Sequence, residues 1–157
     1  MKKALASLLV LVFCALTFAP CVFSAGSCVI TTKVSGKFKK YSVAWTADAN
    51  GDVNDSSTCN LVISGKLVGV EFLASTTNSP SALYDVTLYD STSIPNDVLN
   101  GRGANITAGS SGNQSSWYRS VLDADGGYMK FVDKELYHVV DNAGNATTGT
   151  TVYKVEE

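Results

Sequence analysis

Alternation of apolar and other residues is the feature that most constrains this chain. Tyr84, Val86 and Leu88 occupy every second position of one run, and Val43 and Trp45 do so in an earlier one. A period of two places such side chains on one face of a β-strand, where they can pack together. No segment after residue 25 shows the longer period of a helix. We therefore expect these five side chains in the core of an all-β domain.

Turn residues separate the apolar runs and indicate the domain organisation. Asn, Asp, Gly and Pro cluster between the runs, and the pair Asn50-Gly51 is a strong hairpin signal. The runs predict strands at 28–34, 41–46, 61–73, 83–90, 117–122, 128–132, 136–140 and 150–155, with a short strand at 104–107 in a loop at 91–116. Run 61–73 is either two strands or one bent strand with a glycine bulge. Roughly seven to nine short strands predict a single antiparallel β-sandwich over residues 28–157, of jelly-roll or immunoglobulin type.

Residues 1–25 are typical of a secretory signal peptide. Lys2 and Lys3 precede an uncharged apolar run at 4–19, and small residues follow at 24–27. This order directs a chain to export, after which the segment is removed. An uncleaved anchor is the alternative, because a membrane span needs about 20 apolar residues. Pro20 and the small residues after it favour cleavage, so we expect an exported mature domain.

Two of the four cysteines remain once the signal peptide has been removed. They are Cys28 and Cys59, and an even pair in an exported chain favours a disulfide. This bond would close a loop of about 30 residues and stabilise the fold by ~3–4 kcal/mol. The alternative is two free thiols that never meet. The spacing of these cysteines from the single histidine does not fit a zinc site.

An acidic segment at 48–54 is the one candidate metal site. Asp48, Asn50, Asp52 and Asn54 place oxygen atoms at alternate positions, as a calcium loop does. The EF-hand pattern requires Gly at its sixth position and Glu at its twelfth, where this chain has Val and Cys. A hairpin turn is the simpler interpretation, because turns favour Asn, Asp and Gly. Calcium is kept as the alternative, and no other cofactor is expected.

The charge distribution argues against nucleic acid as a partner. The 12 basic residues of the chain fall to 10, against 14 acidic ones, once Lys2 and Lys3 are removed. The remaining basic residues are scattered, apart from Lys37, Lys39 and Lys40. A nucleic-acid surface needs a wider basic patch than this. Mild acidity of the mature domain mainly favours solubility.

The sequence contains no recognisable catalytic set. His138 is the only histidine, and it lies in an apolar predicted strand. A catalytic base needs a nucleophile and an orienting group, and no serine lies in a nucleophile-elbow pattern. We therefore expect a structural or exposed histidine and a protein that is not an enzyme. Tyr89, Trp117 and Tyr118 are suited to stacking on sugars or bases, although packing in the core or between strands is the favoured explanation.

Several short motifs, taken in order, resemble a known group of proteins. They are VAW at 43–45, DANG at 48–51, ISGKL at 63–67, VEF at 70–72, YDVTL at 84–88, DVLNGRGAN at 97–105 and VDNAG at 140–144. The chain from Val43 to Tyr153 thereby resembles small, mostly uncharacterised tailed-phage and prophage proteins that are virion structural components. The strand at 84–88 followed by the loop at 97–105 is the most specific part. The resemblance implies a structural role and carries no catalytic residues.

Two function hypotheses follow from these observations. The first is a non-enzymatic structural or accessory protein, resembling phage virion components, that binds protein partners or further copies of itself through sheet edges and the loop at 91–116. The second is an exported surface binding module, which either binds glycans through its loop aromatics or is assisted by calcium at 48–54. Neither involves nucleic acid, nor a membrane after signal cleavage. The chain is secreted or periplasmic if residues 1–25 act as a signal, and part of a virion if they do not.

Overall fold

The described part of the chain contains seven β-strands. The computed structural model describes residues 26–54, 57–90, 93–107, 116–120 and 126–157, and no helix occurs among them. The strands are β1 (Ser27–Ser35), β2 (Phe38–Thr46), β3 (Asn60–Ala74), β4 (Asp85–Tyr89), β5 (Ser116–Arg119), β6 (Lys130–Asp141) and β7 (Thr148–Glu156). The all-β prediction is therefore confirmed for this part of the chain. The predicted signal peptide, residues 1–25, lies outside the described residues.

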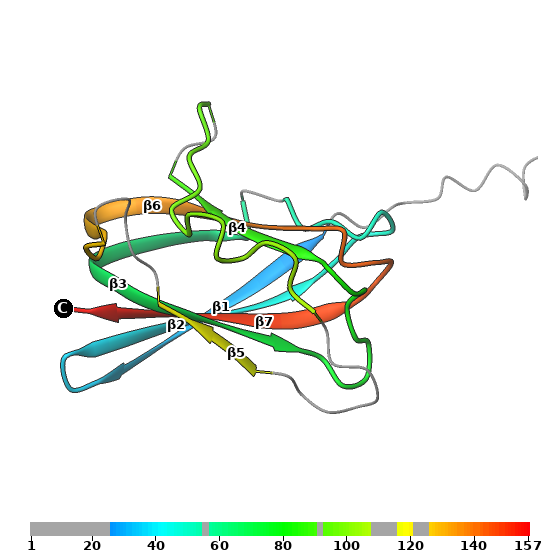
Figure 1. The fold of residues 1–157 in the computed structure, drawn as a ribbon, viewed down its shortest axis with the longest axis horizontal. Coiled ribbons are helices and arrows are strands. Elements are labelled where there is room, and N and C mark those ends of the chain that lie inside the picture. Colours follow the sequence, from blue (N-terminus) through cyan, green and yellow to red (C-terminus); the bar gives the residue numbers. More distant parts are fainter. Residues whose placement is uncertain (1–25, 55–56, 91–92, 108–115, 121–125) are drawn as a thin grey trace, which may run out of the picture.

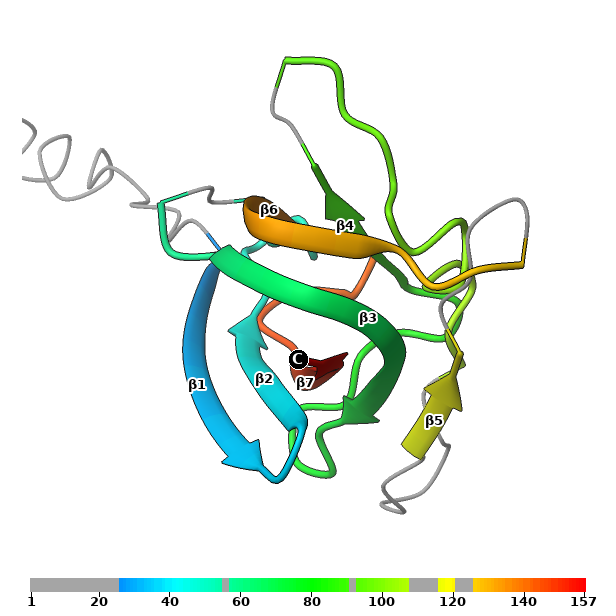
Figure 2. The same cartoon turned by 90° about the vertical axis from the view of Figure 1, so that its left-hand side faces the viewer.

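All seven strands belong to one antiparallel sheet, which curls round the core (Figure 1, Figure 2). The strand order is β1-β2-β7-β3-β6-β4, and β5 also pairs with β3. The first half of β3 pairs with β6, and its second half pairs with β7 and β5. The pairing of β3 shifts register just before Gly65 and again just before Gly69. Run 61–73 is thus one long bent strand, which was the second predicted alternative.

The predicted core residues are buried. Val43, Val86 and Leu88 have no exposed surface, and Trp45 and Tyr84 are at most 2% exposed. The rings of Trp45 and Tyr84 pack with their centroids 5.8 Å apart, which joins β2 to the residue just before β4. Burying each of these side chains stabilises the fold by about 1.5–3 kcal/mol. Period-two alternation therefore identified the core correctly.

Two of the strand assignments predicted from the sequence are wrong. Runs 128–132 and 136–140 form the single strand β6, because the ladder continues through a bulge at Asp133, where φ is 44°. The charged residues at 133–135 therefore do not end the strand, as they would at a turn. The expected strand at 104–107 is reduced to one bridge between Ile106 and Tyr84. Tight turns at Asn100 and Asn105, both with positive φ, keep this segment from extending.

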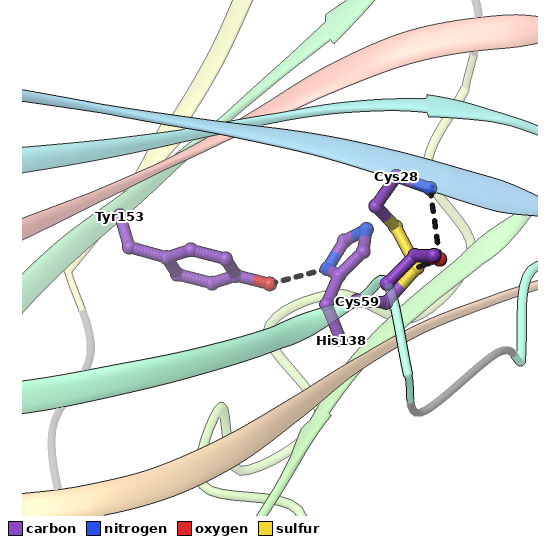
Figure 3. The surroundings of a disulfide bond; sticks show 5 residues. Cys28, Cys59, His138 and Tyr153 are labelled. Atoms are coloured by element: carbon purple, nitrogen blue, oxygen red, sulfur yellow. Dashed lines mark hydrogen bonds between the residues drawn. A yellow bond between two sulfur atoms is a disulfide. The ribbon is translucent and has the colours of Figure 1, made fainter.

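The predicted disulfide between Cys28 and Cys59 is present, with the two Cα atoms 5.1 Å apart. It joins the start of β1, at the margin of the sheet, to the residue that precedes β3 (Figure 3). Cys59 is fully buried and Cys28 nearly so. The backbone N–H of Cys28 also donates to the hydroxyl of Thr58. The bond therefore holds an edge strand that hydrogen-bonds to the sheet on one side through β2.

Candidate functional site

The predicted calcium residues lie in a tight turn. One carboxylate oxygen of Asp48 accepts the backbone N–H groups of Asn50 and Asp52, at 2.8 and 3.0 Å. These bonds, chiefly the one from Asp52, lower the pKa of Asp48. A carboxylate that bonds its own backbone in this way is an Asx turn. Asn54 lies beyond the turn and is exposed.

A second carboxylate of this segment faces the end of β6. Asp52 accepts the backbone N–H of Asn142 at 3.2 Å. The pKa of Asp141 is raised, first by burial and then by the charges of Asp52 and Asp85. Within the described residues, no three or more His, Cys, Asp or Glu side chains are grouped so that they could hold a metal ion. Calcium binding at 48–54 stays a prediction.

Substituting Asp48 by alanine is expected to lower the free energy of unfolding by about 1–2 kcal/mol, because two backbone N–H groups lose a charged acceptor. Thermal or denaturant unfolding measures this loss. It should be the same in a chelator and in excess calcium. Asn54→Ala is the matched control and should change little. A calcium-dependent stabilisation of the unmodified chain, lost in both variants, would instead support the calcium hypothesis.

The only histidine lies in the core. His138 is 1% exposed, and its Nδ1 is hydrogen-bonded to the Tyr153 hydroxyl at 2.7 Å. Its ring lies between Tyr153 and the disulfide, and its backbone N–H donates to the carbonyl of Cys59 (Figure 3). Burial lowers the pKa of His138 to about 3 and raises that of Tyr153. Of the two predicted roles for this histidine, the structure gives the structural one.

The loop that carries the most specific motif covers the edge of β4. The N–H of Val86 donates to the carbonyl of Gly103, and the N–H of Ile106 donates to that of Tyr84, both at 2.8 Å. The carboxylate of Asp97 accepts three backbone N–H groups at 2.9–3.3 Å. A Cβ at residue 103 would lie 1.8 Å from a backbone oxygen, so glycine is required there. The motif thus closes one margin of the sheet.

The opposite margin is β1, and its turn shows which groups face outward. Ser35 and Phe38 pair on either side of a two-residue turn that begins with Gly36, whose φ is 59°. In such a hairpin the flanking pair exchanges both hydrogen bonds, so even-numbered residues of β1 direct their N–H groups away from β2. The bond from the Cys28 N–H to Thr58 agrees with this.

The outward N–H and C=O groups of Ile30, Thr32 and Val34 form what we call the free edge. Among the described residues, no strand other than β2 pairs with β1. Val34 is 61% exposed, and Val29, beside this edge, is 65% exposed. Figure 2 shows β1 at the margin of the curled sheet. An unpaired edge with exposed β-branched residues is a template for pairing with another chain.

A shallow hollow of about 410 Å³ adjoins the free edge. Its lining includes Val29, Ala44, Thr46, Leu73, Thr148 and Thr150, from four strands. Its lining residues include no carboxylate, histidine or cysteine, so the hollow offers contact surface and hydroxyl groups rather than catalytic groups.

Of the aromatic residues suggested for sugars, Tyr89 pairs with Tyr137 across β4 and β6. The side chains of Trp117 and Tyr118 lie outside the described residues.

Sequence reasoning did not identify the free edge. A local pattern predicts a strand but not its place in the sheet, and that place makes β1 an edge. One signal was available: polar or exposed residues from Thr31 to Ser35, including Lys33, are typical of an edge strand.

No described helix is long and apolar enough to cross a membrane. In comparisons with known proteins, no family model, no curated protein and no solved structure matches this chain.

Proposed function

We propose that this chain is a non-enzymatic structural or accessory protein that binds protein partners, or further copies of itself, through the free edge of β1. The observation that carries the proposal is the contrast between the two margins of the sheet. The loop at 97–106 covers β4, whereas β1 has three residues with outward backbone groups. Such groups gain hydrogen bonds when another strand adds to the edge.

Two further features support the proposal. The halves of β3 pair with different strands, so the curled sheet encloses its core between two faces, and we propose that it is a variant of the β-sandwich. A histidine whose pKa is about 3 cannot act as a general base near neutral pH with useful efficiency. Both features favour a binding role similar to that of the virion components which the sequence resembles.

Substituting Thr32 by proline tests the free edge. Proline removes an outward N–H and is tolerated at an edge, so the fold should survive. We expect the fraction of the protein found in virions or other large assemblies to fall at least about tenfold. A strand added to the edge would lose one hydrogen bond and would clash with the proline ring. Density-gradient fractionation of tagged protein from its native host measures that fraction.

Thr32→Ser is the matched control, since serine keeps the N–H group. It should assemble as the unmodified chain does. Equal melting temperatures of the three proteins would show that the fold is intact. The proposal would be refuted if the proline variant enters assemblies as well as the serine variant, or if the unmodified chain is never found in them.

The second candidate is an exported module that binds glycans or is assisted by calcium at 48–54. The hydroxyl-lined hollow beside β1 favours this candidate. Binding of defined oligosaccharides, detected as shifts of the Thr148 and Thr150 NMR resonances, would support this candidate. Location separates the two candidates further. N-terminal sequencing of the native protein reveals whether residues 1–25 are removed, as a secreted or periplasmic protein requires. An intact Met1 would favour a virion component.

A further inference from the structure

Three lysines lie directly opposite one another on adjacent strands. Lys33 of β1 pairs with Lys40 of β2, and Lys40 pairs with Lys154 of β7. Residues that pair across an antiparallel sheet project from the same face, so the three ammonium groups share the outer face. Like charges in directly opposite positions destabilise a sheet. A row of this kind is therefore a cost to the fold that a negatively charged partner would offset.

The next rung on the same face adds more lysines. Phe38 pairs with Glu156, Glu156 with Lys66, and Lys66 with Lys130, across β2, β7, β3 and β6. These two rungs and the β1–β2 turn place seven lysines at one end of the curled sheet, which we call the lysine end. They are Lys33, Lys37, Lys39, Lys40, Lys66, Lys130 and Lys154. Figure 1 shows the β1–β2 hairpin, the end of β7 and the start of β6 at this end, and Figure 2 views the molecule from it.

Two glutamates offset only part of this charge. Lys37 forms an ion pair with Glu156, and the Nζ of Lys39 is 3.7 Å from a carboxylate oxygen of Glu157. Within the described residues, the other five lysines form no ion pair. The Nζ of Lys154 lies 4.2 Å from the centre of the Phe38 ring, a cation–π contact that keeps its charge near the hairpin.

Carboxylates gather at the opposite end of the sheet. Asp48 and Asp52 lie beyond β2, and Asp85 and Asp141 pair where β4 begins and β6 ends. The whole chain has a net charge of −2. The charges are nevertheless separated along the strands, so the molecule has a positive end and a negative end. Such a distribution orients a protein at a charged surface even when its net charge is unfavourable.

We propose that the lysine end docks on an anionic phospholipid surface. Its lysines come from five strands around the end of the curled sheet and from both faces of the β1–β2 hairpin, where Lys39 and Lys40 project oppositely. That arrangement presents a broad array rather than a groove for a linear polymer, so a flat surface contacts most of the lysines at once. Val34, exposed at the tip, adds an apolar contact. The array contains lysines and no arginine, so headgroup phosphates would meet point charges rather than bidentate guanidinium groups.

The sequence alone predicts no membrane partner after signal cleavage. It presents only Lys37, Lys39 and Lys40 as a cluster, which is too few for stable binding. Register brings Lys33 and Lys154 alongside this cluster, although Lys40 and Lys154 lie 114 positions apart in the sequence. Each lysine held near an anionic membrane strengthens binding about fivefold. The array therefore gives reversible binding that depends on salt.

The test replaces Lys33, Lys40 and Lys154 together by glutamine, in protein purified from its native host in the form that accumulates there. Co-sedimentation with phosphatidylglycerol-containing vesicles should show a loss of binding of about 100-fold. The melting temperature should stay the same or rise, because repulsion between opposite lysines is relieved. Binding of the unmodified protein should weaken sharply between about 0.05 M and 0.5 M salt.

Lys134→Gln on β6, set beside Lys40→Gln, is the matched control. The Lys40 variant should bind about fivefold more weakly, and the Lys134 variant should bind as the unmodified protein does. Vesicles of phosphatidylcholine alone report any contribution of the apolar residues 1–25, which is independent of these lysines. Unchanged binding in the triple variant would overturn the proposal. So would equal binding to both kinds of vesicle, or tight binding to duplex DNA without binding to vesicles.

Discussion

Replacing Cys28 and Cys59 together by alanine is expected to lower the free energy of unfolding by about 3–4 kcal/mol. The disulfide closes a loop between residues 31 positions apart, so its loss restores chain entropy to the unfolded state. It also releases β1, whose hydrogen-bonded partner in the sheet is β2. For a domain of this size the melting temperature should fall by roughly 10 °C. Denaturant unfolding followed by tryptophan fluorescence measures the change.

Reduction of the unmodified protein distinguishes the contribution of the cross-link to stability from the contribution of side-chain packing around the cysteines. If the loss comes from chain entropy, the reduced protein and the double alanine variant should unfold at similar denaturant concentrations. A variant much less stable than the reduced protein would indicate that the cavity left at the buried Cys59 dominates. A variant as stable as the oxidised protein would refute the prediction.

Local patterns were sufficient to predict most of the strands and the core residues. Val43, Trp45, Tyr84, Val86 and Leu88 are buried because each lies on the apolar face of an alternating run, and that alternation is visible in any short window. The disulfide could also be predicted, since the two cysteines that follow the predicted signal peptide have one possible connection. These features depend on residues close in sequence or on simple elimination.

Sheet order and register could not be predicted in the same way. Lys33 and Lys154 lie 121 positions apart, and both meet Lys40 only because β2 lies between β1 and β7. The free edge of β1 depends on the same order. Both proposed surfaces are thus products of long-range pairing, whereas the acidic segment at 48–54 was visible in the sequence and is used largely in a local turn.

The bulge at Asp133 illustrates a related limit. Three consecutive charged residues at 133–135 interrupt the apolar pattern, as a turn would. In the structure, Asp133 has a positive φ, and the ladder with β3 resumes one residue later. A bulge adds a residue to one strand without ending it, and its position is fixed by the partner strand. The sequence of β6 alone therefore cannot distinguish a bulge from a turn.

Acidification is expected to destabilise the domain through His138. Its pKa is about 3 in the folded protein, whereas an unperturbed histidine in the unfolded chain has a pKa near 6.5. The unfolded chain therefore takes up the proton first. The stabilising contribution is complete above about pH 6.5 and is lost progressively as the pH falls towards 3. Between pH 7 and 4.5 the free energy of unfolding should fall by roughly 2–3 kcal/mol, as measured by denaturant unfolding at several pH values.

His138→Gln isolates this effect, because glutamine can still bond the Tyr153 hydroxyl but does not titrate. Asp48, whose pKa is lowered, and Asp141, whose pKa is raised, titrate in both proteins, so the difference between their pH profiles belongs to His138. Tyr153→Phe removes the hydrogen bond but keeps the histidine buried, so the pH dependence should persist. Because burial is the cause of the lowered pKa, an unchanged pH dependence in the glutamine variant would show that the imidazole is accessible to protons in the folded state.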